Sequence, residues 1–356
     1  MADWEANVRR VVPYTPGEQP KRNDIIKLNT NECPYPPAPG VAKALLEFEA
    51  DKLRLYPDPA ALELREAIAA AVSIPEHPVA ADQVFVGVGS DDVLALAFLT
   101  FFNSKKPILF PDISYSFYSV WADLFGIKYE RPALDADFRI VKADYFKENG
   151  GIIFPNPNAP TGIYMELDQV EKIISGNPDS IVIVDEAYVD FAGPSAMELV
   201  DKYDNLLVVQ TFSKSRSLAG MRIGFAVGQP RLIKYLNDVK YSFNSYTMNL
   251  PSIKLGAAAV KDEAYFRETV GKIVATRERV KKELTDLGFT FPDSQSNFIF
   301  ATHKSWPAKE LFEELKKEDI YVRYFASPRI DNYLRITVGT DEEMDALLAF
   351  LRKKGN

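Results

Sequence analysis

The 356-residue sequence is poor in the residues from which many active sites are built. It contains one cysteine, Cys33, so no disulfide can form within the chain, and two histidines, His77 and His303. This scarcity argues against a zinc site of the usual kind, and we expect no metal. A Ser-His-Asp or Cys-His enzyme would be poorly supplied with bases. A single cysteine fits a reducing compartment, so we expect a cytoplasmic protein.

Long apolar runs and an excess of positive charge are also missing. The first ten residues, MADWEANVRR, lack the apolar core of a secretory signal, and no apolar run reaches membrane-spanning length. Lys and Arg number 42 against 50 Asp and Glu, which gives a net charge of −8. We therefore expect neither a membrane nor a nucleic-acid partner, and any phosphate must be bound by a few placed donors.

The remaining composition is that of an ordinary globular protein, with 47% apolar and 26% charged residues. The first 40 residues are rich in proline and predict an arm with little regular structure. Helical periodicity at 60–72 is followed by Val, Ile and Leu runs that alternate with helices, which predicts a mainly parallel sheet covered on both faces. A long charged helix and short strands, among them IYVRYF, then predict a smaller α+β unit. We expect an arm at 1–50 that contributes to the small domain and the active site, a large domain at 51–246 and the small domain at 247–356.

Polar residues repeatedly follow the ends of the predicted strands. In open α/β sheets the carboxyl ends of the strands form the edge where ligands bind. Side chains that come from different strand ends should therefore meet in one place. The segments concerned are 89–91, 114–115, 156–162, 185–188 and 211–214.

The segment TFSKSRSLAGMRIGF combines an amine with hydroxyls and a guanidinium directly after an apolar run. Most lysines are solvated surface groups, but Lys214 follows a buried strand. A desolvated lysine can form a Schiff base with a carbonyl compound. Thr211, Ser213 and Arg222 supply the donors that suit a phosphate dianion. Arg216 is assigned to the surface or to a structural ion pair.

A glycine turn, GVGSDD, follows the strand QVFV and opens a helix. Backbone N–H groups at such a helix start can seat an anion, although many turns of this kind only cap helices. The turn lacks the full dinucleotide fingerprint, which disfavours a nicotinamide enzyme.

Asp185 ends the apolar run IVIV. Most aspartates in this position are caps or loop anchors, but a buried carboxylate can also keep a pyridine nitrogen protonated. Tyr188 would then reach the ring hydroxyl, while Tyr115 stacks on the ring or serves in packing. Arg323 and Arg335 lie in predicted half-buried strands, where a guanidinium usually needs an anionic partner, either protein or ligand.

Five segments together resemble the fold-type I pyridoxal-phosphate aminotransferases: TFSKSRSLAGMRIGF, IVDEAYVDF, NPNAPTG, GVGSDD and LNTNECPYPP. The resemblance covers nearly the whole chain, in order, and ends with YLRITVGTDEE. It implies pyridoxal 5'-phosphate as cofactor. It also implies a large domain with a mostly parallel seven-stranded sheet covered by helices, and a small α+β domain.

The resemblance assigns a role to each matching residue. Lys214 is expected to join the cofactor aldehyde as an imine, Asp185 to pair with the ring nitrogen and Tyr188 to bond the ring oxygen. Tyr56 is expected to reach the cofactor phosphate of a neighbouring subunit, which implies a homodimer with shared active sites. The other expected cofactor contacts are Ser90, Asp91, Tyr115, Thr211, Ser213 and Arg222, and the expected substrate contacts are Tyr14, Asn31, Arg323 and Arg335.

Within this family, the likeness is greatest to the members that act on L-histidinol phosphate. The implied reaction converts that amine and 2-oxoglutarate to imidazole acetol phosphate and glutamate in histidine biosynthesis. Three alternatives stay open: an aromatic amino-acid aminotransferase, a threonine-phosphate decarboxylase, and a non-catalytic protein that binds a phosphorylated ligand.

One position departs from the family pattern. The family usually has Asn directly before Pro-Thr-Gly, where it bonds the ring oxygen, whereas this chain has Ala159. Asn158 or Asn156 could take over that bond through a shifted loop, or Tyr188 could act alone; of these we expect Asn158. A cis peptide bond before Pro160 would be typical of such a proline-rich turn near an active site. Cys33 is expected to have a passive apolar role.

Overall fold

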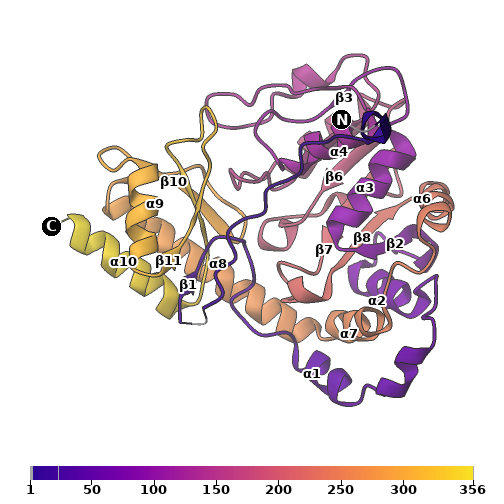
Figure 1. Ribbon diagram of the computed structural model, residues 1–356, viewed down its shortest axis with the longest axis horizontal. Helices are drawn as coiled ribbons and strands as arrows, with labels where there is room; N and C mark the ends of the chain where they lie inside the picture. Colours follow the sequence, from indigo (N-terminus) through magenta and orange to yellow (C-terminus); the bar gives the residue numbers. More distant parts are fainter. Residues whose placement is uncertain (1–2, 23, 356) are drawn as a thin grey trace.

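The large sheet is the element that positions the site. The structure, a computed structural model, describes residues 3–22 and 24–355. The strands of this sheet have the order β2-β8-β7-β6-β5-β3-β4 (Figure 1); β8 runs antiparallel to both of its neighbours, and the other pairs are parallel. The strands are β2 (Val84–Val88), β3 (Ile108–Leu109), β4 (Tyr129–Glu130), β5 (Ile152–Pro155), β6 (Val182–Asp185), β7 (Leu206–Thr211) and β8 (Ile223–Gly228). The predicted mostly parallel seven-stranded sheet is confirmed.

Helices cover both faces of this sheet, which explains why its strands are apolar throughout. Successive residues of β6 alternate between the two cores: Val182 and Val184 pack on one face, and Ile183 packs on the other. The first face is covered by α2 (Leu62–Val72), α5 (Leu167–Ser175) and α7 (Leu250–Lys261), and the second by α3 (Ser90–Phe101), α4 (Phe117–Phe125) and α6 (Pro230–Phe243).

The smaller unit lies beside the large sheet, with the long helix α8 (Glu263–Asp286) reaching from one to the other (Figure 1). Its antiparallel sheet has the order β12-β13-β10-β9, and its own core lies between that sheet and the helices. The elements are β9 (Phe289–Thr290), β10 (Phe298–His303), β12 (Arg323–Tyr324), β13 (Leu334–Thr337), α9 (Ala308–Lys317) and α10 (Asp341–Gly355). The predicted small α+β domain is confirmed as an architecture, while the exact domain boundaries remain a prediction.

The segment IYVRYF differs from the prediction of one strand. It forms two short strands in different sheets, because β11 (Ile320–Tyr321) pairs in parallel with β1 (Ile26–Lys27) of the arm, whereas β12 pairs with β13. Val322, between them, is buried. The arm is otherwise irregular up to α1 (Pro39–Leu46), as expected. Short 3₁₀ helices lie at Asp3–Asn7, Ala50–Arg54, Ala81–Gln83, Lys142–Tyr145, Val189–Phe191, Ala196–Leu199 and Ala219–Met221.

The described residues contain neither a membrane-spanning helix nor a cluster of metal ligands. Within residues 3–22 and 24–355, no helix is both long and apolar enough to cross a bilayer. In the same residues, His, Cys, Asp and Glu side chains nowhere form a group of three or more that could hold a metal ion.

Candidate active site

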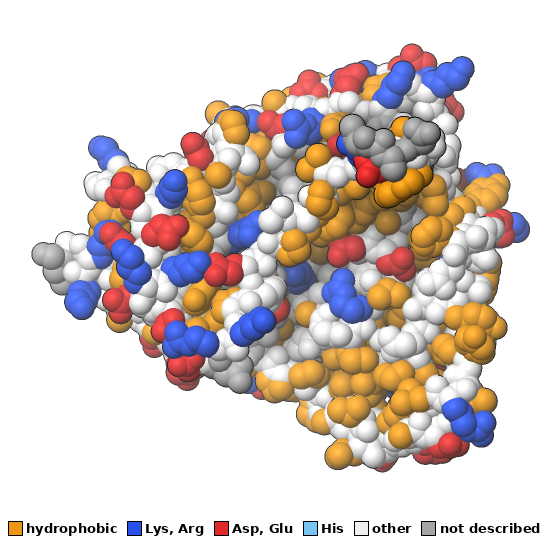
Figure 2. Space-filling view, in the orientation of Figure 1, with side chains coloured by type: hydrophobic (Ala, Val, Ile, Leu, Met, Phe, Trp, Pro, Cys, Tyr) orange, Lys and Arg blue, Asp and Glu red, His pale blue; other side chains and the backbone are white. Residues whose placement is uncertain are grey.

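The polar residues that follow the strand ends do gather at one edge of the large sheet. Asp185 ends β6 and lies opposite Pro155 of β5 and Val209 of β7. Two residues beyond Val209, β7 ends at Thr211, and the chain turns to Lys214. Figure 2 shows a recess between the large and small units in which basic and acidic side chains lie.

Asp185 is a buried carboxylate with one oxygen bonded and one oxygen free. Its Oδ2 accepts a hydrogen bond of 2.7 Å from the Tyr118 hydroxyl. Its Oδ1 has no hydrogen-bond partner among the residues that the structure describes. Burial raises the pKa of Asp185 from 3.8 to about 6, although the Tyr118 bond opposes this rise. A cationic N–H donor placed at Oδ1 would satisfy the free oxygen and stabilise the ionised carboxylate.

Lys214 lies between the large sheet and the N-terminal arm. Its Nζ donates a hydrogen bond of 3.1 Å to the Thr30 carbonyl oxygen and lies 5.9 Å from the centre of the Tyr188 ring. The side chain is only partly exposed. The Thr30 carbonyl thus holds the amine at the pocket, the Glu32 carboxylate interacts with it electrostatically, and the amine can be released from the carbonyl to a ligand.

Hydroxyl, guanidinium and backbone donors converge beside this amine. Thr211 Oγ1 donates to Ser213 Oγ over 3.0 Å and accepts from the Ser213 N–H over 3.1 Å. Arg222 Nη1 lies 3.4 Å from Ser213 Oγ. Helix α3 begins at Ser90, so its first N–H groups face the same region. These donors form a seat for a compact anion.

Two glycines permit this close convergence. Gly89 has φ +83°, and a Cβ there would lie 2.4 Å from Arg222 Nη2. A Cβ at Gly224 would lie 2.2 Å from the Ser90 backbone nitrogen. A side chain at either position would therefore collide with the donors of the anion seat.

Asp91 has a different function from the donors around it. Its Oδ1 accepts a hydrogen bond of 2.8 Å from the Tyr115 hydroxyl, and its Oδ2 lies 3.5 Å from Arg222 Nη2. A carboxylate repels a phosphate, so the side chain of Asp91 orients Tyr115 and Arg222. Only its backbone N–H, in the first turn of α3, can take part in the anion seat.

Two arginines lie on the small-domain side of the recess. Arg323 and Arg335 are direct cross-strand neighbours on β12 and β13, and each guanidinium lies 5.5 Å from the Phe325 ring. Arg335 Nη2 donates to the Asn29 carbonyl oxygen over 3.0 Å, whereas its buried Nε has no partner among the described residues. Burial lowers the pKa of Arg335, and the charge of Arg323 lowers it further. Adjacent like charges of this kind favour a bound anion.

Three successive arm residues connect these groups. The carbonyls of Asn29 and Thr30 accept hydrogen bonds from Arg335 and Lys214, respectively, and Asn31 Nδ2 donates to the Tyr188 hydroxyl over 2.9 Å. Sequence reasoning missed this use of the arm backbone, because carbonyl groups carry no signal of residue type. It also missed Tyr118, which does not stand out from the other 16 tyrosines of the chain.

Two further predicted residues, Tyr14 and Tyr56, differ in how far they are exposed to solvent. Tyr14, partly buried, stacks on Phe117 with ring centres 4.4 Å apart. Tyr56 is 83% exposed and forms a ring pair with Tyr246, with centres 4.7 Å apart. A single chain therefore does not bring Tyr56 into a closed pocket, and its proposed contact with a neighbouring subunit stays a prediction.

The loop at 156–162 has the cis peptide bond predicted before Pro160, and a second one before Pro157. Asn158 Nδ2 donates to the Ile113 carbonyl and to Thr161 Oγ1, each over 3.0 Å, and its buried Oδ1 has no partner within the described part of the chain. The amide nitrogen of Asn158 is thus already engaged, and its proposed bond to a ring oxygen stays a prediction.

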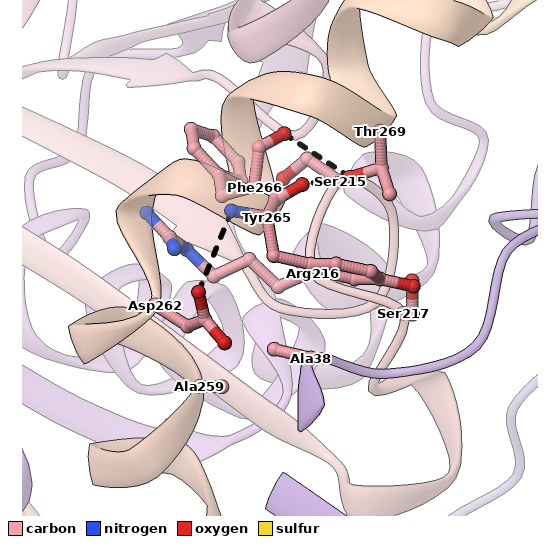
Figure 3. Close-up of a pocket in the computed structure, with 9 residues that line it drawn as sticks. All are labelled: Ala38, Ser215, Arg216, Ser217, Ala259, Asp262, Tyr265, Phe266 and Thr269. Atoms are coloured by element: carbon pink, nitrogen blue, oxygen red, sulfur yellow. Dashed lines mark hydrogen bonds between the residues drawn. The ribbon is translucent and has the colours of Figure 1, made fainter. Parts of the chain in front are cut away.

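Arg216 is partly buried, and its buried Nη1 has no hydrogen-bond partner among the described residues. Figure 3 shows its side chain beside the N-terminal part of α8, where its guanidinium lies 4.0 Å from the Phe266 ring. Burial lowers the pKa of Arg216, and the nearby Asp190 charge opposes that effect. The cavity around it, of about 10 Å³, has room for no more than a water molecule. Arg216 is therefore not a fully solvated surface group, and its assignment to a structural ion pair stays a prediction.

The residues of the recess fit a pyridoxal phosphate molecule. Asp185 Oδ1 offers the unpaired acceptor that a protonated pyridine nitrogen needs. Lys214 offers the amine, and the seat formed by Thr211, Ser213 and Arg222 offers donors for a phosphate. Gly89 and Gly224 leave no room for a Cβ beside this seat.

Comparisons with known proteins agree with this fit. The family model described as "Aminotransferase class I and II" matches residues 23–351. A histidinol-phosphate aminotransferase of Lactococcus lactis subsp. cremoris is 51% identical, covering 98% of this chain and 97% of that protein. One of Brachyspira hyodysenteriae is 54% identical, covering 95% of this chain and 94% of that protein.

The fold is shared with solved structures as well. The crystal structure of a histidinol-phosphate aminotransferase from Sinorhizobium meliloti, in complex with pyridoxal-5'-phosphate, matches with a TM-score of 0.82. The match covers 92% of this chain and 89% of that one at 23% identity, so it speaks for the fold alone. The chain belongs to the aminotransferase class I and II family and, within it, to the histidinol-phosphate aminotransferases.

Proposed function

We propose that the protein is a pyridoxal-phosphate-dependent aminotransferase that converts L-histidinol phosphate and 2-oxoglutarate to imidazole acetol phosphate and glutamate in histidine biosynthesis. Relatives that carry this activity in their names align over nearly the whole chain. The observation that carries the proposal is the combination in one recess of Lys214 and Asp185, whose Oδ1 has no partner among the described residues, with two adjacent arginines, Arg323 and Arg335, on the small-domain side. A cytoplasmic location completes the proposal and fits the single cysteine.

The chain's own residues have distinct tasks in this reaction. When bound, pyridoxal phosphate supplies an electron-withdrawing ring that takes up the electrons of the broken Cα–H bond. Asp185 holds the proton on the ring nitrogen, which keeps the ring electron-withdrawing. Lys214 Nζ, once released from the Thr30 carbonyl, removes the proton from the substrate Cα as general base. Tyr188 holds the ring oxygen, and Ser90, Thr211, Ser213 and Arg222 hold the phosphate.

The substrate's own phosphate accounts for the second cationic region. Arg323 and Arg335 place two guanidiniums side by side, which suits a doubly charged group better than a single carboxylate. Tyr14 completes the proposed substrate contacts, whereas the side-chain amide of Asn31, predicted as a further contact, already bonds Thr337 and Tyr188. Fixing the far end of the substrate orients the Cα–H bond relative to the cofactor, an effect that contributes on the order of several kcal/mol to catalysis.

We further propose that two copies of the chain form a homodimer with shared active sites. An exposed apolar surface supports this, and Figure 2 shows such side chains gathered on the large unit near α1. Clustered exposed apolar residues of this kind mark interaction surfaces. Tyr56 belongs to this group, and its exposure fits the contact with the partner's cofactor phosphate that the family resemblance implies. The exposed residues concerned are Leu45, Leu46, Leu53, Leu55, Tyr56, Phe243 and Tyr246.

One kinetic comparison tests the substrate assignment. We expect kcat/KM for histidinol phosphate, with 2-oxoglutarate as acceptor, to exceed that for phenylalanine by about 10²-fold or more, since charged hydrogen bonds to the phosphate are lost with phenylalanine. A preference for phenylalanine would instead indicate an aromatic amino-acid aminotransferase. Release of carbon dioxide from threonine phosphate would indicate the decarboxylase.

A further inference from the structure

A buried chain of hydrogen bonds runs from β13 to the Tyr188 hydroxyl. Thr337 Oγ1 donates to Asn31 Oδ1 over 3.0 Å, and Asn31 Nδ2 donates to the Tyr188 hydroxyl over 2.9 Å. Thr337 is 2% exposed and Asn31 is 1% exposed. Because solvent does not reach these groups, each must find its donors and acceptors within the protein.

The direction of this chain is fixed by the backbone of Asn31. The Asn31 N–H donates to Thr337 Oγ1 over 3.0 Å, so the Thr337 hydroxyl directs its own proton to Asn31 Oδ1. With Oδ1 turned to Thr337, Nδ2 faces Tyr188. The Tyr188 oxygen therefore accepts a hydrogen bond from Asn31, and the phenolic proton must point elsewhere.

The backbone at Asn31 supports this arrangement. Its φ is +58°, a left-handed conformation that Asn tolerates better than most residues. The Asn31 carbonyl also accepts a hydrogen bond of 2.9 Å from Asn297 Nδ2. Asn31 is thus held by small-domain residues through its N–H, its C=O and its side chain.

We propose that Thr337 and Asn31 are positioning residues that orient the Tyr188 hydroxyl as a hydrogen-bond donor into the cofactor pocket. We call this chain of hydrogen bonds from Thr337 through Asn31 to Tyr188 the relay. The proposal rests on the proposed function, in which Tyr188 holds the ring oxygen. The side chains of residues 158 and 159 offer no comparable donor in this structure, because Ala159 ends in a methyl group and Asn158 Nδ2 is engaged by two other acceptors.

The relay also connects the tyrosine to the strand that carries a substrate arginine. Arg335 and Thr337 are two residues apart on β13, so their side chains leave the same face of the strand. Arg335 bonds the Asn29 carbonyl, and Thr337 bonds Asn31. Two charged groups lie near Tyr188: Lys214 Nζ is 5.9 Å from its ring centre, and Arg335 interacts with it electrostatically.

The test compares holoenzyme variants by the pH midpoint of the change in cofactor absorbance. A donor to the ring oxygen stabilises its anionic form, so losing the donor raises that midpoint. We expect Tyr188→Phe to raise the midpoint by about 1 pH unit. Asn31→Gly, which permits the positive φ without strain, should raise it by about 0.3 unit through loss of cooperative strengthening. Thr337→Val should shift it in the same direction, and Thr337→Ser, which retains the hydroxyl, should restore the wild-type midpoint.

A double variant separates the relay from a general structural role. In the Tyr188→Phe background, Asn31→Gly should cause no further shift, because its effect passes through the tyrosine hydroxyl. An equal shift in both backgrounds, or no shift in the wild-type background, would overturn the relay even if thermal stability falls. Absence of any cofactor absorbance in the wild-type protein would instead contradict the proposed function.

Discussion

The two ends of the recess bury charges of opposite sign, and the two charges respond to burial in opposite directions. At the sheet edge, burial raises the pKa of Asp185 to about 6. On the small-domain side, burial lowers the pKa of Arg335, which lies opposite Arg323. In the protein without ligand, burial therefore disfavours the charged form of both Asp185 and Arg335. A ligand with a cationic ring nitrogen at one end and an anionic group at the other would stabilise both charges, as the cofactor and the phosphorylated substrate do in the proposed reaction.

The largest expected effect comes from removing the amine that lies between the two ends. Lys214→Ala should lower kcat by about 10⁴-fold or more, because both the covalent link and the general base are lost. The thermal unfolding midpoint should change little, since Lys214 makes one neutral hydrogen bond. Lys234→Ala, at an exposed position of α6, is the matched control. Substantial transaminase activity in Lys214→Ala would contradict the assignment.

Neutralising the acidic end should have the next largest effect on catalysis. Asp185→Asn keeps the shape of the side chain but leaves the ring nitrogen without its carboxylate. We expect kcat to fall by about 10²- to 10³-fold, the usual cost of losing one preorganised electrostatic partner. Rates with deuterated substrate would show whether proton removal has become slower. An unchanged kcat would count against the pairing of Asp185 with the ring.

The same substitution should stabilise the cofactor-free protein at alkaline pH. Because the folded pKa of Asp185 is raised from 3.8 to about 6, the folded chain retains a proton between these pH values that the unfolded chain has released. The contribution of Asp185 to the free energy of unfolding therefore falls as pH rises from about 4 to about 6. At pH 8, Asp185→Asn should raise that free energy by about 2–3 kcal/mol.

Urea unfolding of the cofactor-free proteins at pH 8 and pH 4 would measure this effect. The gain from Asp185→Asn should be largest at pH 8 and vanish near pH 4. Asp238→Asn, at an exposed surface pair, is the control and should show no such pH dependence. A stabilisation that is equal at both pH values would show that burial of the charge is not its cause.

Removing one guanidinium from the cationic end should weaken the binding of phosphorylated substrates only. Arg323→Ala should raise KM for histidinol phosphate by about 10- to 100-fold through loss of charge-assisted hydrogen bonds. The KM for phenylalanine should change by less than about threefold, because that substrate has no phosphate. Arg352→Ala, an exposed residue of α10, serves as control. Equal increases for both substrates would favour an aromatic amino-acid aminotransferase.

The smallest effect is expected at the anion seat. Ser213→Ala removes one hydroxyl that contacts Thr211 and Arg222. The Kd for pyridoxal phosphate should rise by about 3- to 10-fold, as for one hydrogen bond among several. Equilibrium dialysis of the cofactor would measure it. A rise in Kd beyond 10³-fold would contradict this expectation and would mean that the other donors of the seat depend on Ser213 for their positions.

The two ends also differ in how far they could be predicted from sequence. Asp185, Thr211 and Lys214 follow apolar runs, and parallel pairing brings such strand ends to one edge, so their meeting was predictable. Arg335 is different, because it bonds the carbonyl of Asn29, 306 residues away.

Long-range contacts such as the bond from Arg335 to Asn29 depend on how distant parts of the chain pack together. The arm lies across the recess because β1 pairs with β11. Each of these strands has only two residues, so the sequence has no periodicity from which the pairing could be predicted. The Thr337–Asn31–Tyr188 relay and the bond from Tyr118 to Asp185 were missed for the same reason. The sequence predicted the residue types of the small-domain site, and long-range packing determined their partners.

The covalent link between Lys214 and the cofactor is the central claim, and chemical trapping tests it most directly. The protein is saturated with pyridoxal phosphate, reduced with borohydride, digested and examined by peptide mass analysis. We predict that the reduced phosphopyridoxyl adduct lies on the peptide that contains Lys214. Recovery of that peptide without modification, from protein that has bound the cofactor, would contradict the account.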